Sequence, residues 1–267
     1  MHCGAPRSGS GGTATRKRIA IIAALERELW PLIKSWRNST FTYDGREFTA
    51  YETNYAVAMC GGIGAEYARA AAEAAIAKYS PEILISAGVA GATVPELHVA
   101  DTVFPSVVVD TTDGSRHETA ITRAALASTP LARTVLASSE SIASASLKRQ
   151  LAKAYGAHVV DMEAAAVARA AQKHGLRFVA IKTISDEIDF DIPELGRFVR
   201  GGKFATSRFI FYVILRPALW WKTLCLARNT QRASENLCAW LRESALTHTI
   251  VAGEVSPPNP EWQSHSN

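Results

Sequence analysis

The 267-residue chain has few cysteines and no long uncharged apolar run. Its four cysteines form no CxxC pair and have no metal-ligand spacing with histidine, so the sequence predicts no metal site. The scarcity of thiols favours a reducing, cytoplasmic environment over an oxidising one. No stretch of roughly 18 uncharged apolar residues is present, so we expect no ordinary transmembrane helix.

Neither sign of charge dominates the chain. The formal net charge is +4, and the Lys and Arg residues are scattered, which predicts no nucleic-acid partner. Apolar residues make up 48% of the chain and charged residues 20%, so the chain can bury a substantial core and is not disordered throughout.

The two ends of the sequence differ in composition from the rest. Residues 1–16 are rich in Gly and Ser and lack the apolar run of a signal peptide, so they are predicted to be a disordered leader. Residues 251–267 are rich in Pro and Ser and are predicted to be a disordered tail. The folded domain is expected to span residues 17–250.

Apolar runs alternate with helical patterns between these ends. The expected strands are residues 18–24, 83–87, 102–109, 134–138, 158–160 and 178–184, with a hairpin at 47–60. The expected helices are residues 26–36, 65–78 and 161–174. This alternation predicts an α/β fold, a single three-layer domain with a mixed, largely parallel central sheet flanked by helices. Glycines at 88 and 91 and a proline at 95 predict a loop after the strand at 83–87.

Three acidic residues follow predicted strands. Glu28, Glu163 and Asp186 each lie at the end of an apolar run or about one turn beyond it. Ligands of such sheets bind beyond the carboxyl ends of the strands, so convergence of these acids is plausible. Paired carboxylates suit the cleavage of a glycosidic bond, because one can hold sugar hydroxyls while another protonates the leaving group.

Four motifs resemble those of the nucleoside phosphorylase and nucleosidase superfamily, and most strongly those of 5′-methylthioadenosine/S-adenosylhomocysteine nucleosidases. They are IAIIAALERE (19–28), GGIG (61–64), SAGVAG (86–91) with VADTV (99–103), and DMEA (161–164) with ISD (184–186). The likeness keeps order and spacing over roughly residues 18–189. It implies hydrolysis of the N-glycosidic bond of a 5′-substituted adenosine, with release of adenine, in a homodimer that needs no cofactor.

The resemblance also implies roles for single residues. Asp186 would be the general acid that protonates the purine, and Ser185 would orient it. Glu163 would accept hydrogen bonds from ribose hydroxyls, and Met162 would pack against ribose and base. Glu28 would be the base that activates water. The further substrate-binding residues that it implies are Ile63, Gly88, Val89 and Ile142.

The chain departs from the phosphorylases of this superfamily at the residues that grip phosphate. Those enzymes use GDPxR after the first strand and RxGS after a later one, whereas this chain reads ALERE (24–28) and SAGV (86–89). The missing donors would leave a bound dianion poorly compensated, which favours water as the nucleophile. Other arginines could still replace the missing donors. They are Arg27, Arg69 and Arg116.

The acids, the GGIG segment and His117 also have simpler, purely structural explanations. Glu163 suits the start of a helix through the dipole alone, Asp186 suits a cap, and Glu28 suits a solvated helix surface. The GGIG segment could be only a tight turn, or it could offer backbone amides to a ligand. His117 lies in a polar loop, where most histidines are solvated.

The C-terminal part goes beyond the likeness. Residues 190–245 are predicted to form an apolar helical extension, and residues 204–241 mix aromatic side chains with Arg and Lys. That pattern fits a peripheral membrane contact, a lid, an oligomer contact or an ordinary pair of core helices. It also suggests that the substrate carries a large, hydrophobic 5′ substituent, as in the hopanoid-associated branch of the superfamily.

Three functions therefore remain open. They are a purine nucleosidase, a phosphate-dependent purine nucleoside phosphorylase, for which a lipid-linked adenosine is one candidate substrate, and a catalytically inactive nucleoside-binding protein. The last is the least favoured, because a scaffold without catalysis would have no reason to keep all three acids in register.

Overall fold

The computed structural model describes residues 19–121, 131, 133–191, 195–205, 212 and 216–246. The predicted leader at 1–16 and tail at 251–267 lie outside the described residues. Within the described part, no helix is long and apolar enough to cross a membrane.

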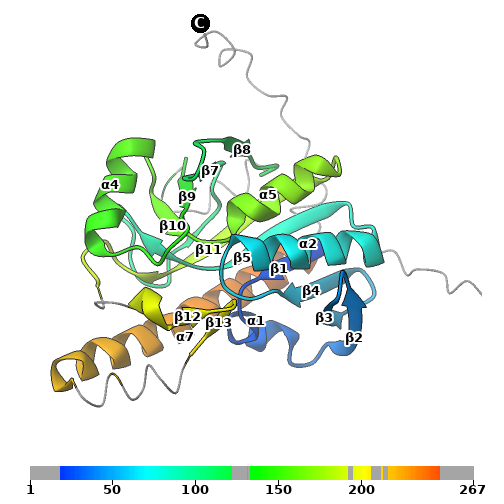
Figure 1. Ribbon diagram of the computed structural model, residues 1–267, viewed down its shortest axis with the longest axis horizontal. Helices are drawn as coiled ribbons and strands as arrows, with labels where there is room; N and C mark the ends of the chain where they lie inside the picture. The colour runs from blue at the N-terminus through cyan, green and yellow to red at the C-terminus, as the bar shows by residue number, and fades with distance from the viewer. Residues whose placement is uncertain are drawn as a thin grey trace, which may run out of the picture.

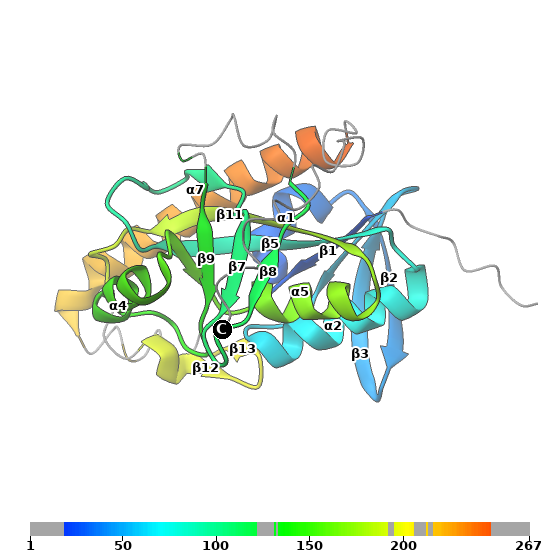
Figure 2. The same ribbon diagram turned by 90° about the horizontal axis from the view of Figure 1, so that it is seen from above.

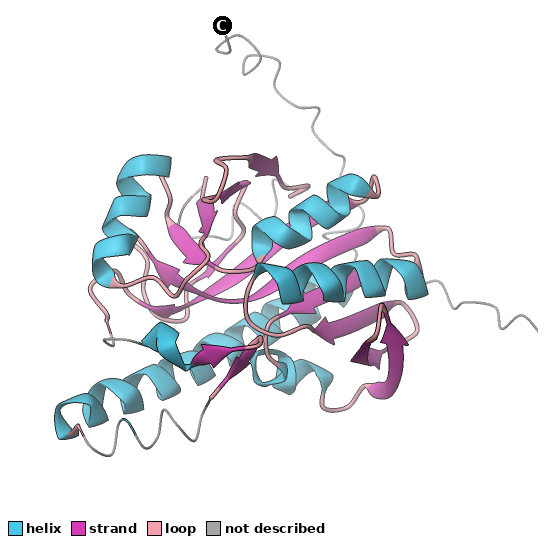
Figure 3. Cartoon of the chain, viewed as in Figure 1, coloured by secondary structure: helices cyan, strands magenta, loops and turns pink. Residues whose placement is uncertain are grey.

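The described residues form an 11-stranded mixed sheet (Figures 1 and 3). Its path runs β2-β3-β4-β1-β5-β10-β9-β7-β8, while β11 pairs with β5 and with β6. The strands are β1 (Ile19–Ala23), β2 (Arg37–Tyr43), β3 (Arg46–Glu52), β4 (Ala56–Cys60), β5 (Ile83–Ala92), β6 (Thr102–Val103), β7 (Val107–Asp110), β8 (Arg116–Glu118), β9 (Val135–Ser138), β10 (Val159–Asp161) and β11 (Arg177–Asp186). Strand β1 is parallel to β4 and β5, β11 is parallel to β5, and β9 is parallel to β7 and β10.

Helices cover both faces of this sheet (Figure 2). Helices α2 (Ala65–Tyr79) and α5 (Ala164–Lys173) pack side by side on one face, and α1 (Glu26–Ile33) and α7 (Pro217–Leu246) pack together on the other. The remaining elements are α4 (Ala145–Tyr155), the 3-10 helix η1 (Leu195–Phe198) and a separate hairpin of β12 (Val199–Arg200) and β13 (Lys203–Phe204). The predicted three-layer α/β fold is therefore confirmed.

Strand β1 shows why an unbroken apolar run forms a central strand. Successive side chains of a strand point to opposite faces. Ile19, Ile21 and Ala23 are buried in the core under α1 and α7, whereas Ala20 and Ile22 are buried in the core under α2 and α5. Both faces therefore need apolar residues, and an alternating pattern would not satisfy them.

Several expected elements differ from the structure. Strand β2 was not predicted, because its side chains are only exposed or half-buried and form no apolar run. The expected strand at 102–109 is two strands, since β6 pairs with β11 and β7 pairs with β9. The predicted helix at 161–174 begins at Ala164, after β10 has ended. The predicted apolar helical extension contains the β12–β13 hairpin as well as α7.

The prediction of a loop at Gly88 and Gly91 is wrong, because both residues lie inside the ten-residue strand β5. Glycine is needed there for close approach. A Cβ atom at Gly88 would lie 3.1 Å from Glu28 Oε2, and one at Gly91 would lie 2.9 Å from Asp186 Oδ2. These glycines mark the places where acidic side chains cross a strand.

Candidate active site

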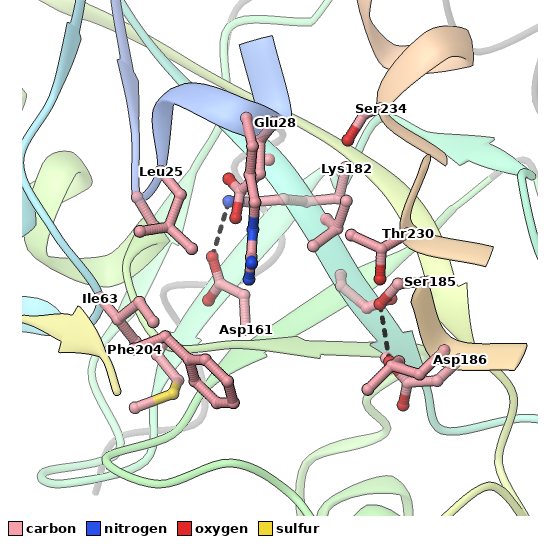
Figure 4. Close-up of a pocket in the computed structure, with 18 of the residues that line it drawn as sticks. Leu25, Glu28, Ile63, Asp161, Lys182, Ser185, Asp186, Phe204, Thr230 and Ser234 are labelled. Carbon is pink, nitrogen blue, oxygen red and sulfur yellow. Dashed lines mark hydrogen bonds and ion pairs between the residues drawn. The ribbon is translucent and has the colours of Figure 1, made fainter. Parts of the chain in front are cut away.

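A cavity of about 1150 Å³ lies where the carboxyl ends of β1, β5, β10 and β11 meet α1 and α7. Every predicted site residue lines it, namely Glu28, Ile63, Gly88, Val89, Ile142, Met162, Glu163, Ser185 and Asp186. Figure 4 shows two polar groups in this cavity, one around Glu28 and Lys182 and the other around Asp186. The structure thus brings together residues that are far apart in the sequence.

The first polar group centres on Lys182, which sequence analysis missed. Its Nζ lies 2.8 Å from Asp161 Oδ2 and donates to Ser86 Oγ at 3.1 Å. Glu28 is buried beside this lysine, across Gly88. Lys182 is the single charged residue between Arg177 and Asp186 on β11, and a lone charge in a buried strand is the signal that could have found it.

Glu163 is directed toward the cavity by backbone donors. Gly64 N donates to Glu163 Oε1 at 2.8 Å, and Met162 N donates to Glu163 Oε2 at 3.2 Å. The cap of α5 comes from another residue, because Ala164 N donates to Asp161 Oδ2 at 3.0 Å and Glu163 makes no capping bond. Helix capping therefore does not account for Glu163.

The GGIG segment, residues 61–64, makes protein contacts through its backbone amides. Gly64 N binds Glu163, and Ile63 N donates to Gly202 O at 2.7 Å in the turn between β12 and β13. A Cβ atom at Gly61 would lie 2.4 Å from Tyr67 O, so only glycine fits this turn. The segment holds both Glu163 and the β12–β13 hairpin beside the cavity.

Glu28 and Glu163 share an unusual electrostatic environment. Burial raises the pKa of Glu28 to about 7, and the nearby charge of Glu163 adds to this, while Lys182 and Arg27 oppose it. Burial likewise raises the pKa of Glu163 to about 7, with a further contribution from Asp161 and opposition from Lys182. Two carboxyl groups thus titrate near neutral pH in one cavity, as is common in active sites.

These pKa values predict a pH-dependent stability. In the folded protein Glu28 holds its proton up to about pH 7, whereas its ordinary pKa is 4.5. Between these values the folded state binds more protons than the unfolded state, so the free energy of unfolding decreases as the pH rises through this window. For the wild type, we expect this titration to lower the free energy of unfolding by on the order of 3 kcal/mol between pH 4.5 and 8. The Glu28→Gln variant should lack this decrease.

Urea denaturation of both proteins at several pH values measures this effect. The exposed Glu47→Gln substitution is the matched control and should follow the wild-type pH dependence. An identical pH dependence of stability in Glu28→Gln and wild type would show that Glu28 titrates normally.

The second polar group contains Asp186 and two supporting side chains. Ser185 Oγ donates to Asp186 Oδ1 at 2.7 Å, and Lys148 forms an ion pair with Asp186 Oδ2. The pairing register of β11 with β5 shifts between Ile184 and Asp186. Such a bulge re-aims a side chain, and here it directs Asp186 into the cavity.

Lys148 was also missed by sequence analysis. It lies on α4, is 1% exposed, and its Nζ also donates to Glu187 O at 2.7 Å. It precedes the buried Leu151 by three residues, so it lies on the inward face of α4. A lysine on such a face is the signal that could have found it, although the sequence reading did not identify α4 as a helix.

The remaining wall of the cavity comes from α1, α7 and the β12–β13 hairpin. Arg27 lies over the ring of Phe204, with its guanidinium carbon 5.9 Å from the ring centroid. Helix α7 contributes a stripe of mostly small or polar residues, Thr223, Leu226, Ala227, Thr230, Gln231, Ser234 and Glu235.

Three residues considered in the sequence analysis lie away from this cavity. Arg69 on α2 and Arg116 on β8 are exposed and do not line it. His117 also does not line it, and its ring Nε2 lies 3.3 Å from Ser115 Oγ. Of the three arginines considered as phosphate donors, Arg27 alone lines the cavity.

Comparison with known proteins gives consistent matches. The 5′-methylthioadenosine/S-adenosylhomocysteine nucleosidase of Shewanella halifaxensis is 29% identical over 204 residues, which cover 66% of this chain and 89% of that protein. The nucleosidase of the same name from Shewanella baltica is 30% identical over 208 residues, which cover 66% of this chain and 86% of that protein.

Solved structures share the fold. The 5′-methylthioadenosine/S-adenosylhomocysteine nucleosidase of Helicobacter pylori matches with a TM-score of 0.62 at 20% identity, covering 86% of this chain and 100% of that one. Futalosine hydrolase of Helicobacter pylori matches with a TM-score of 0.61 at 20% identity, covering 85% of this chain and 98% of that one. The sequence profile of the phosphorylase superfamily matches residues 18–200, and with this match the chain belongs to that superfamily.

Proposed function

We propose that this protein hydrolyses the N-glycosidic bond of a 5′-substituted adenosine and releases adenine. The observation that carries the proposal is the presence in one cavity of Glu28, Glu163 and Asp186, each fixed by its own polar partners or close contacts. The activity for which the Shewanella relatives are named, that of a 5′-methylthioadenosine/S-adenosylhomocysteine nucleosidase, supports the substrate class.

Asp186 acts on the purine. It donates a proton to the imidazole-ring nitrogen while the bond from the sugar to the base breaks, so that the electron pair leaves with a neutral base. Ser185 and Lys148 hold its two carboxylate oxygens before the substrate enters.

Glu163 and Glu28 act on the sugar side. Glu163 accepts hydrogen bonds from ribose hydroxyls, and Met162 beside it packs against the ribose. Glu28 removes a proton from a water molecule whose oxygen then bonds to the anomeric carbon. A pKa near 7 suits this base, because the carboxylate is available at neutral pH and still accepts a proton well.

Water is the favoured nucleophile because the two buried lysines of the cavity are already paired with carboxylates. Lys182 contacts Asp161, and Lys148 contacts Asp186. Phosphorolysis is the second candidate, since Arg27 lines the cavity next to Glu28 and could bind a phosphate. A lipid-linked adenosine is the alternative substrate, supported by the size of the cavity.

Adenine release from methylthioadenosine and adenosylhomocysteine tests the proposal, measured without phosphate and then with phosphate added. We expect release in phosphate-free buffer and little change on adding phosphate. Release that requires phosphate would establish the phosphorylase instead. Absence of release under both conditions, repeated with an adenosine that carries a long alkyl 5′ group, would favour the inactive binding protein.

The Lys148–Asp186 pair gives a further prediction. Lys148→Met removes the ammonium that holds Asp186 Oδ2, so the acid loses its alignment toward the purine. Misplacement by about 1 Å can cost roughly 10²-fold in rate, so we expect kcat to fall on that order while KM changes less. Steady-state kinetics of adenine release measure both values.

Lys153→Met is the matched control, because Lys153 is exposed on the same helix. It should keep wild-type kinetics. A Lys148→Met enzyme with unchanged kcat and an unchanged melting temperature would show that Asp186 is aligned without Lys148.

A further inference from the structure

Four large apolar side chains are exposed on α1 and on the first half of α7. They are Trp30 (51% exposed), Trp220 (54%), Trp221 (70%) and Leu224 (46%). We call this set the aromatic edge. Exposed tryptophans are costly in water, and the close spacing of Trp220, Trp221 and Leu224 on the first half of α7 indicates a surface that meets another phase or molecule.

The first half of α7 extends beyond the body of the described protein, where its yellow-orange end protrudes (Figure 1). The buried residues of α7 are concentrated in its second half, where Leu237, Cys238 and Leu241 pack against the sheet and α1. The described helix is thus anchored mainly at its second half, whereas its first half exposes Trp220, Trp221 and Leu224 and contributes Thr223 and Ala227 to the cavity wall.

The residues of the aromatic edge adjoin residues that line the cavity. Residues three or four apart lie on one face of a helix, so Trp220 and Leu224 lie on the same face as Thr223 and Ala227. Thr223 and Ala227 line the cavity, and so does the exposed Trp30 on α1. The exposed apolar side chains therefore lie at the outer border of the cavity.

Positive charge is concentrated on the same segment. Residues 195–234 contain eight Lys and Arg and no Asp or Glu, whereas the rest of the chain contains 21 basic and 25 acidic residues. On α7 the side chains of Lys222, Arg228 and Arg232 are exposed. A surface that combines exposed tryptophans with unbalanced positive charge complements an anionic lipid surface.

Other occupants fit less well. A second copy of the chain, seated on itself through a two-fold axis, would place two strongly basic segments against each other. A nucleic-acid duplex, whose bases are already stacked on one another, would neutralise the charges and leave Leu224 and the tryptophans without an apolar partner. We propose that the aromatic edge and its basic flank dock this protein on an anionic phospholipid surface. The inference does not depend on the proposed reaction.

Co-sedimentation of the full chain with vesicles tests the docking. Vesicles of phosphatidylcholine alone are compared with vesicles that also contain phosphatidylglycerol, at low and at high salt. We expect binding to the anionic vesicles and its loss at high salt, because exposed charges are screened. Each basic residue near an anionic surface contributes about 1 kcal/mol, so Lys222→Glu with Arg228→Glu should weaken binding at least about tenfold.

A second variant tests the apolar contribution. Trp220→Ser, Trp221→Ser and Leu224→Ser together should abolish most of the binding and leave the fold intact, since all three side chains are exposed. Tyr55→Ser is the matched control, because Tyr55 is an exposed aromatic residue at the β3–β4 turn. Its binding should equal that of the wild type.

Three outcomes would overturn the inference. The first is the absence of wild-type binding to anionic vesicles, and the second is a triple variant that binds as well as the wild type at an unchanged melting temperature. The third is a wild type that does not bind vesicles but self-associates, with the self-association lost in the triple variant. The last outcome would assign the aromatic edge to a contact between copies of the chain. A failure of the adenine-release assay with intact vesicle binding would affect the proposed function alone.

Discussion

Replacing Asp186 by Asn is expected to lower kcat for adenine release roughly 10²- to 10⁴-fold, because the amide has no proton to give to the leaving purine. The substitution keeps the shape of the side chain, and Ser185 can still donate to its amide oxygen. The ion pair with Lys148 is lost, so the effect includes alignment as well as proton transfer. Single-turnover kinetics with methylthioadenosine measure the chemical step directly.

Asp189→Asn is the matched control for this experiment. Asp189 is 78% exposed at its side chain and pairs with Arg149 at the surface. It should retain wild-type turnover. If Asp186→Asn retains wild-type turnover as well, another group protonates the base, and the assignment of Asp186 is wrong.

Replacing Glu28 by Gln is expected to lower kcat in phosphate-free buffer by a similar factor, roughly 10²- to 10⁴-fold, because the amide cannot accept the proton of the attacking water. In the wild type the base must be charged. With a pKa of about 7 in the free protein, kcat/KM should fall as the pH decreases below about 7. The variant should lose this limb of the profile, which a pH series of initial rates would detect.

Glu47→Gln serves as the control here too, because Glu47 is exposed on β3. The Glu28→Gln substitution separates catalysis from stability, because the variant is expected to be more stable than the wild type at pH 8 and yet almost inactive. Full activity of Glu28→Gln without phosphate would remove Glu28 from the mechanism. A rate restored only by phosphate would favour phosphorolysis.

The sequence by itself determined the layered fold and the acids of the site. The run Ile19–Ala23 is apolar at every position, as a strand needs when helices cover both faces. The position of each acid after an apolar run, together with the resemblance of the surrounding motifs, also predicted Glu28, Glu163 and Asp186, and all three line the cavity.

The tertiary structure alone decided what each acid contacts. Asp186 meets Lys148, which is 38 residues away in the sequence, and Glu163 meets Gly64, which is 99 residues away. Periodicity reports which face of an element is buried and carries no information on which distant group lies opposite. The same limit hid the capping role of Asp161 and the reason for glycine at position 91, where the carboxylate of Asp186 fills the space that a side chain would need.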